Sequence, residues 1–350
     1  MDKQTLRIID TITSRIGDSL TINQLTERIK ETYGSAYYAN VYQKIRAIEK
    51  EGLLKIESIG KSSSLKLNFQ NYILIDEIAE MEIEKKINFL TKRNNLLPFL
   101  TELDTSFHDT CTIKSIISMN PSRTVKLNRM DLLFVLGNTI NYHDETIEIC
   151  KEMQRLQNKH NLKINNLIIN KDDFSELSTS DEINPVREAL SQKIIFLYPQ
   201  IFWSIIKEIE AKNKIHTITT ETKPSDISES TMAFNLNRFG YKEFGLNLTQ
   251  SDKICIEYII TAILLQEDAR KTDATAIILA KNNFKSNILC FLSQKFQTTG
   301  KLLGILKVLQ EIKPTPEINK TIALLKTFKT EEQPADGESI RKNMRLYNAL

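Results

Sequence analysis

The stretch from Ser35 to Asn68 constrains the fold more than any other part of this chain. Its first half has apolar residues at helical spacing, which predicts a helix with one buried face. These residues are Tyr38, Val41, Ile45 and Ile48. Gly52 then stands where a glycine commonly ends a helix. The second half predicts a β-hairpin, with strands over 53–59 and 65–67 joined by the polar loop 60–64.

The opposite side of this predicted helix carries small, amide and basic side chains. Amides can pair with adenine edges in the major groove of DNA, and Arg or Lys can reach guanine or phosphate. A basic, hydroxyl-rich hairpin loop suits contacts with phosphate. The predicted DNA-binding residues are Asn40, Gln43, Lys44, Arg46, Ala47 and Lys50 on the helix, with Lys61, Ser62 and Ser63 in the loop.

Two amphipathic helices precede this stretch, the second beginning after the N-cap residue Thr21. The first has its apolar face at Leu6, Ile9, Ile12 and Ile16. The order helix, helix, turn, helix, hairpin resembles the winged-helix family over residues 3–68. The resemblance implies that residues 36–51 are the recognition helix, that residues 60–64 are the wing, and that the partner is double-stranded DNA. Winged helices also mediate protein contacts, so a protein partner stays open.

The bulk composition narrows these possibilities. A chain of 350 residues should hold two or three domains, and a net charge of only +3 restricts any DNA contact to a local patch. No apolar run is long enough to span a membrane, and no signal pattern opens the chain. The cysteines Cys111, Cys150, Cys255 and Cys290 lie in apolar contexts without metal-site spacing, which predicts buried free thiols in a reducing cytoplasm and neither metal nor cofactor. The abundance of Ile, Lys and Asn favours an archaeal or bacterial source.

The pattern along the chain predicts a multidomain α+β protein. The expected parts are a winged helix (1–70), a linker helix (71–93), a central α/β domain (94–212), a linker (213–232) and a helical bundle (233–350). Alternating aromatics over 234–245 predict a hairpin or an arm. The linker helix is either a connector packed on its neighbours or a dimerising helix, since winged-helix regulators often pair to match two half-sites. We expect a homodimer.

The central region carries a second resemblance, in the segment IISMNPSRTVKLNRMDLLFVL. It resembles nucleotidyltransferases of the minimal, DNA-polymerase-beta-like type. That family has a Gly-Ser turn, then two aspartates one residue apart, and later a third acid. These acids bind metal ions that position nucleotide phosphates. Here Ile117-Ser118 stands at the Gly-Ser position, Arg129-Met130-Asp131 at the paired aspartates, and Asn165 or Asn166 at the third acid.

The departures from that family argue against catalysis. A branched side chain replaces the glycine, a fixed positive charge replaces one metal ligand, and an amide replaces the third acid. Asp131 alone cannot hold two divalent ions. We therefore expect a pseudo-enzyme whose vestigial nucleotide site is made of Ser118, Arg129, Asp131 and Asn166. Binding of a nucleotide or protein effector there, and a purely scaffolding role, both stay open.

Together these patterns predict a sequence-specific DNA-binding protein, a transcription regulator with a degraded transferase-like domain. One alternative is a divergent active nucleotidyltransferase that uses Asp131 to modify a protein or RNA. Another is a protein-binding adaptor, such as the neutralising half (antitoxin) of a toxin pair.

Overall fold

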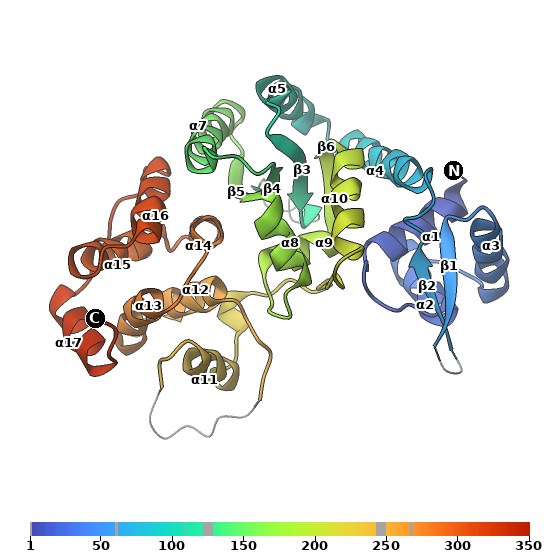
Figure 1. Cartoon of the computed structure of the whole chain (residues 1–350). Coiled ribbons are helices and arrows are strands. Elements are labelled where there is room, and N and C mark those ends of the chain that lie inside the picture. Colours follow the sequence, from blue (N-terminus) through green and yellow to red (C-terminus); the bar gives the residue numbers. More distant parts are fainter. Residues whose placement is uncertain (1, 60–61, 109, 122–128, 243–249, 267–268) are drawn as a thin grey trace.

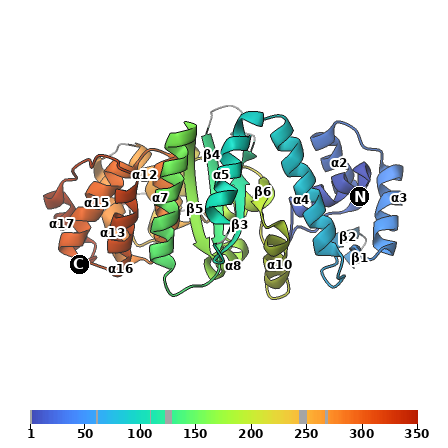
Figure 2. The same ribbon diagram turned by 90° about the horizontal axis from the view of Figure 1, so that it is seen from above.

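The structure is a computed structural model that describes residues 2–350 apart from 60–61, 109, 122–128, 243–249 and 267–268. It is a mixed α+β molecule, as predicted. Figures 1 and 2 show an elongated shape, with the first helices at one end, the last helices at the other and a four-stranded sheet between them.

The N-terminal region has the order of elements that the sequence predicts. Its elements are α1 (Lys3–Thr13), α2 (Ile22–Tyr33), α3 (Tyr38–Lys50), β1 (Leu54–Ile59) and β2 (Ser62–Leu67). Thr21 and Gln24 form a capping box at the start of α2, which satisfies backbone donors that the helix leaves free. The Leu65 N–H donates to the Leu20 carbonyl at 2.8 Å, so the segment before α2 pairs with the hairpin.

The predicted polar loop 60–64 is too long. Residues 62–64 belong to strand β2, where Ser64 lies opposite Glu57 and is 2% exposed. Three consecutive serines suggest a loop by composition, but their backbone continues the antiparallel ladder, and the pleat turns alternate side chains inward. Lys61, expected at the loop tip, lies outside the described residues.

The central sheet has the order β5-β4-β3-β6. Its strands are β3 (Ile113–Met119), β4 (Arg129–Leu136), β5 (Lys163–Asn170) and β6 (Lys193–Leu197). Strand β3 is antiparallel to both β4 and β6, whereas β4 and β5 are parallel. Both faces of β4 are covered, which explains its unbroken apolar run.

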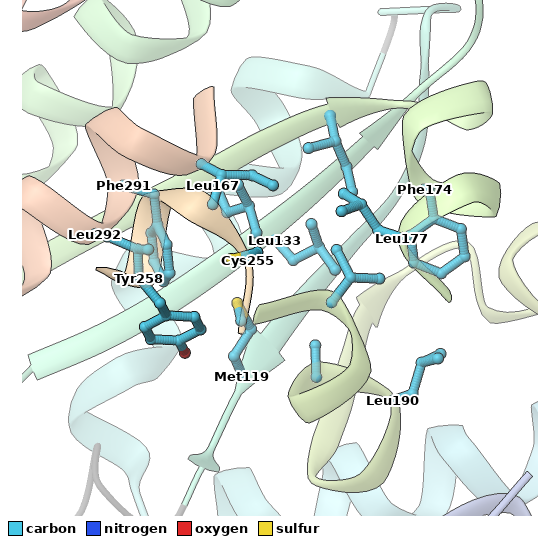
Figure 3. Close-up of a cluster of buried hydrophobic side chains, with 14 of the residues drawn as sticks. Met119, Leu133, Leu167, Phe174, Leu177, Leu190, Cys255, Tyr258, Phe291 and Leu292 are labelled. Atoms are coloured by element: carbon cyan, nitrogen blue, oxygen red, sulfur yellow. The ribbon is translucent and has the colours of Figure 1, made fainter. Parts of the chain in front are cut away.

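Two layers of helices cover the sheet. One face packs against α5 (Leu97–Phe107, preceded by the short 3₁₀ helix η1, Asn94–Leu96) and α7 (Tyr142–His160). The other face meets α8 (Lys171–Thr179), α9 (Pro185–Ser191), α10 (Pro199–Glu210) and the C-terminal helices. Figure 3 shows this second interface. Leu133 and Leu167 of the sheet share an apolar cluster with Phe174 of α8 and with Phe291 of the C-terminal helices.

Helix α4 (Leu74–Thr91) is a connector within the chain. It packs on α10 and β6, and Leu74, Ile78 and Met81 are buried. The apolar residues Ile78 and Met81 are therefore used for packing inside the chain. Ile83 and Ile87 remain exposed, so a homodimer through α4 stays a prediction.

The segments predicted as a linker and as an arm have structures that differ from these predictions. Residues 215–222 pack on the sheet domain, because Ile215 is buried and the His216 and Ile218 N–H groups donate to backbone carbonyls of residues 178 and 187. Helix α11 (Glu229–Arg238) follows the 3₁₀ helix η2 (Pro224–Asp226) and crosses the expected boundary at 232/233. The arm prediction is wrong over 234–238, since Met232, Ala233 and Leu236 form a helical apolar stripe instead.

The C-terminal bundle contains α12 (Ile256–Gln266), α13 (Ala269–Lys281), α14 (Ser286–Lys295), α15 (Thr299–Ile312), α16 (Pro316–Thr327) and α17 (Gly337–Leu346). One cluster of buried apolar side chains is continuous from α1 through one face of the sheet to α17, and a second cluster lies between the other face of the sheet and helices α5 and α7. Of the cysteines, Cys111 is exposed, contrary to expectation, and the other three are buried and free. Within the described residues, no helix combines the length and apolarity that crossing a bilayer requires.

Candidate functional site

In the part of the chain that the structure describes, no other element covers the outer face of α3. This helix packs on α1, α2 and β1 through Val41, Ile45 and Ile48, and it lies at the outer end of the molecule (Figures 1 and 2). The predicted contact residues Asn40, Gln43, Arg46, Ala47 and Lys50 are all exposed. Ser63 is exposed on strand β2, which pairs with β1, the strand on which α3 packs. The structure therefore brings most of the predicted DNA-binding residues to one surface.

Several cations near this surface have carboxylate partners of their own. Lys44 is half-buried and pairs with Asp2, the N-cap residue of α1. The hydrogen bond from Lys44 holds the pKa of the Asp2 carboxyl well below its usual range. Arg46 pairs with Glu49 at 2.8 Å. Lys50 is exposed and, among the described residues, has no carboxylate within ion-pair distance.

One part of the predicted helix pattern is wrong: Tyr38 does not join the buried face. Its side chain is 49% exposed, and its ring stacks on Tyr42 with the centroids 6.0 Å apart. Tyr38 is the first residue of α3, and the buried stripe begins one turn later at Val41. The Arg46 guanidinium lies over the Tyr42 ring at 5.2 Å, so the three side chains form a stack along the outside of the helix.

Of the residues predicted to form a vestigial nucleotide site, Asp131 is 4% exposed and is surrounded by partners. Its carboxylate accepts a hydrogen bond from Asn165 Nδ2 at 2.5 Å and forms an ion pair with Lys295 Nζ at 3.0 Å. Arg129 Nε lies 3.8 Å away, and the Arg129 guanidinium also donates to the Lys295 carbonyl. Of the two candidates for the third-acid position, Asn165 is thus the one that contacts Asp131.

Ser118 and Asn166 do not join this group. They lie opposite Leu132 in the sheet, whose side chain belongs to the core under α5 and α7, whereas Asp131 is paired with Met119 and Asn165 on the other face. Because successive strand residues point to opposite faces, the predicted four-residue site is split by the sheet. Ser118 also lies within strand β3 rather than in a turn.

The turn comes later than the family pattern suggests. Asn120 has φ +46°, a left-handed conformation that glycine adopts most easily and asparagine better than other residues. The residues that follow, 122–128, are outside the described part of the chain. The left-handed backbone conformation thus occurs at Asn120, whereas Ile117 lies within strand β3.

Lys295 is the main site residue that sequence reasoning missed. It ends α14, is 2% exposed and also pairs with Glu221 Oε1 at 2.7 Å. Burial alone would lower the pKa of Lys295, but the carboxylates of Asp131 and Glu221 raise it above its ordinary value. Nothing in the local sequence points to this role, because a lysine at the end of an apolar helix usually lies at the surface.

A buried glutamate lies close to the group formed by Asp131, Lys295 and Glu221. Glu188 is buried, accepts hydrogen bonds from Tyr258 Oη at 3.0 Å and the Thr222 N–H at 2.8 Å, and has its pKa raised by burial. In the residues that the structure describes, no group of three or more His, Cys, Asp and Glu side chains is arranged to hold a metal ion. Comparison with protein-family models, with curated proteins and with solved structures gave no match for this chain.

Proposed function

We propose that this chain is a sequence-specific DNA-binding regulator that contacts double-stranded DNA through the outer face of α3. The observation that carries the proposal is the exposure of Asn40, Gln43 and Lys50 on one uncovered helix face, next to the β1–β2 hairpin. A helix fits the major groove of B-DNA, and small residues such as Ala47 let its backbone approach the bases.

The proposed contacts divide into two kinds. Asn40 and Gln43 would read base edges, and Lys50 would neutralise a phosphate. Gln43→Ala should then relax sequence preference by about 1–3 kcal/mol at one position. Lys50→Ala should weaken binding to all sequences alike and lower the slope of log affinity against log salt by about one unit.

Selection of bound fragments from random duplex DNA, followed by gel-shift titration at several salt concentrations, tests this division. Lys92→Ala is the matched control, because Lys92 is an exposed lysine after the end of α4, away from α3. Equal losses from the changes at Lys50 and Lys92, or absence of an enriched sequence, would contradict the proposal.

For the central region we propose a scaffold rather than a transferase. Asp131, the one acid retained from the family pattern, is already neutralised by Lys295 at 3.0 Å, and an ammonium group beside it opposes the approach of a divalent cation. Incubation with labelled nucleoside triphosphates and Mg²⁺ should give no label transfer. Transfer that Asp131→Ala abolishes would establish the enzymatic alternative.

We also propose a homodimer that forms through α4. The exposed side chains of Ile83 and Ile87 lie one turn apart on α4 and could meet a second copy of the same helix. Sedimentation of the intact protein and of Ile87→Glu would distinguish a dimer through this surface from a monomer.

A further inference from the structure

The surface of α3 is unusually aromatic for a duplex-reading helix. Tyr37 is 74% exposed, Tyr38 49% and Tyr42 37%. Tyr38 and Tyr42 stack with an angle of 25° between their rings, and Arg46 continues the stack one turn further on. The Arg46 side chain is held there by its Nε donating to Tyr42 Oη at 3.2 Å and by the ion pair with Glu49.

The charge on this surface is lower than the number of its cations suggests. Lys44 and Arg46 are paired with Asp2 and Glu49. Because each carboxylate offsets the charge of its cation, these side chains attract phosphate less strongly. The phosphate attraction that normally dominates duplex binding is therefore reduced. Exposed tyrosine rings offer a different source of affinity, because every base has a flat face that can stack on an aromatic side chain.

We infer that the stack formed by Tyr38, Tyr42 and Arg46 binds unpaired bases, so that the preferred ligand is DNA with a locally unpaired segment beside a duplex. The inference rests on the proposed function, since it assumes that α3 contacts DNA, and it names the class of DNA. Gln43 is exposed three residues before Arg46 on α3, so it neighbours the end of the stack and supplies an amide group that can bond the exposed edge of an unstacked base.

The stack is organised before any ligand arrives. The two rings and the guanidinium are spaced one helical turn apart, at positions 38, 42 and 46, on a helix whose inner face is completely buried at Ile45. A base therefore meets a surface that loses little side-chain freedom on binding, which favours affinity. Tyr37, the most exposed of the three tyrosines, is the N-cap residue of α3 and directly precedes Tyr38 in the chain.

Fluorescence anisotropy with three labelled probes tests the inference: a duplex of mixed sequence, the same duplex with a central run of unpaired thymines, and the single strand alone. The interrupted duplex should bind at least several-fold more tightly than the perfect duplex. Tyr42→Leu should weaken binding to the interrupted duplex about tenfold, within the range measured for loss of one stacked base, and should affect the perfect duplex much less.

Two variants separate the ring from its other effects. Tyr42→Phe keeps the ring and loses only the hydroxyl that accepts from Arg46, so it should bind like the parent. Tyr72→Leu is the matched control, because Tyr72 is 90% exposed and precedes α4 rather than lying on α3. Circular dichroism checks that each variant is folded.

The outcomes are distinct. Equal affinity for perfect and interrupted duplexes, or an unchanged affinity in Tyr42→Leu while Lys50→Ala weakens binding, would overturn the inference and leave the proposed function intact. Absence of binding to every probe would overturn the proposed function itself, and would turn the aromatic surface into an interface for a protein partner.

Discussion

Replacing Lys295 with methionine removes the positive charge at the centre of a buried group while keeping a side chain of similar length. Lys295 Nζ lies 3.0 Å from Asp131 and 2.7 Å from Glu221, and these acids are 4% and 15% exposed. Without the ammonium, two carboxylates are left in a low-dielectric environment, facing each other across the gap that it filled. Removal of one partner of a buried ion pair typically destabilises a protein by about 3–5 kcal/mol.

The remaining contacts of Asp131 place the expected loss near the lower end of that range. The hydrogen bond from Asn165 at 2.5 Å survives the change, and Arg129 Nε is still 3.8 Å away. We therefore expect Lys295→Met to lower the free energy of unfolding by about 3 kcal/mol at neutral pH. Urea unfolding followed by the fluorescence of Trp203, the only tryptophan in the chain, measures this loss.

Two further variants make the test specific. Lys285→Met is the matched control, because Lys285 stands at the start of α14 and pairs with Asp173 and Glu176, but its side chain is 27% exposed. An accessible pair of this kind should contribute only about 0–1 kcal/mol. The double variant Asp131→Asn, Lys295→Met removes both charges and should recover much of the loss. A loss below about 1 kcal/mol in the single variant, or no recovery in the double one, would refute the reasoning.

Two other changes test the junction between the N-terminal region and the sheet. Gly17 has φ +86°, and a Cβ there would lie 2.0 Å from the Ile215 carbonyl oxygen, so Gly17→Ala should lower the free energy of unfolding by about 2 kcal/mol or more in the same urea assay. Burial lowers the pKa of Lys193 to about 8, so the unfolded chain binds more protons between pH 8 and 10.5 and stability should rise with pH over that window. Lys193→Met should abolish this rise and raise stability at pH 7, while Glu82 keeps its ion pair with Lys85 at 3.4 Å. A rise that persists in the variant, or an alanine at 17 that costs nothing, would contradict these assignments.

Local patterns predicted the N-terminal region well, because its elements are fixed by short-range signals. The capping box at Thr21 and the apolar residues Val41, Ile45 and Ile48 act within a few residues of themselves. The exposed side of α3 followed from the same periodicity. Tyr38 was misplaced because periodicity alone cannot tell whether the first turn of a helix reaches the core.

The central site could not be predicted in the same way. Residue spacing identified Asp131 and Arg129, but the side of the sheet on which Ser118 and Asn166 lie depends on strand register, which is set across the sheet rather than along the chain. The main partner, Lys295, comes from a helix more than 160 residues later in the sequence, as its ion pair with Asp131 shows. Contacts of this range leave no local signal.

Buried charges join both ends of the molecule to the same face of the sheet. At the C-terminal side Lys295 contacts Asp131, and at the N-terminal side Lys193 donates to the carbonyls of Leu190 and Thr13. Such groups add little stability compared with apolar packing, but they accept only a narrow set of partner positions. Because apolar surfaces tolerate small shifts and charges of this kind do not, these two contacts should fix the orientation of α3 relative to the rest of the chain. If so, Lys193→Met should leave the core intact and broaden the relative orientations of the two ends, which distance measurements between labels on α3 and α17 can detect.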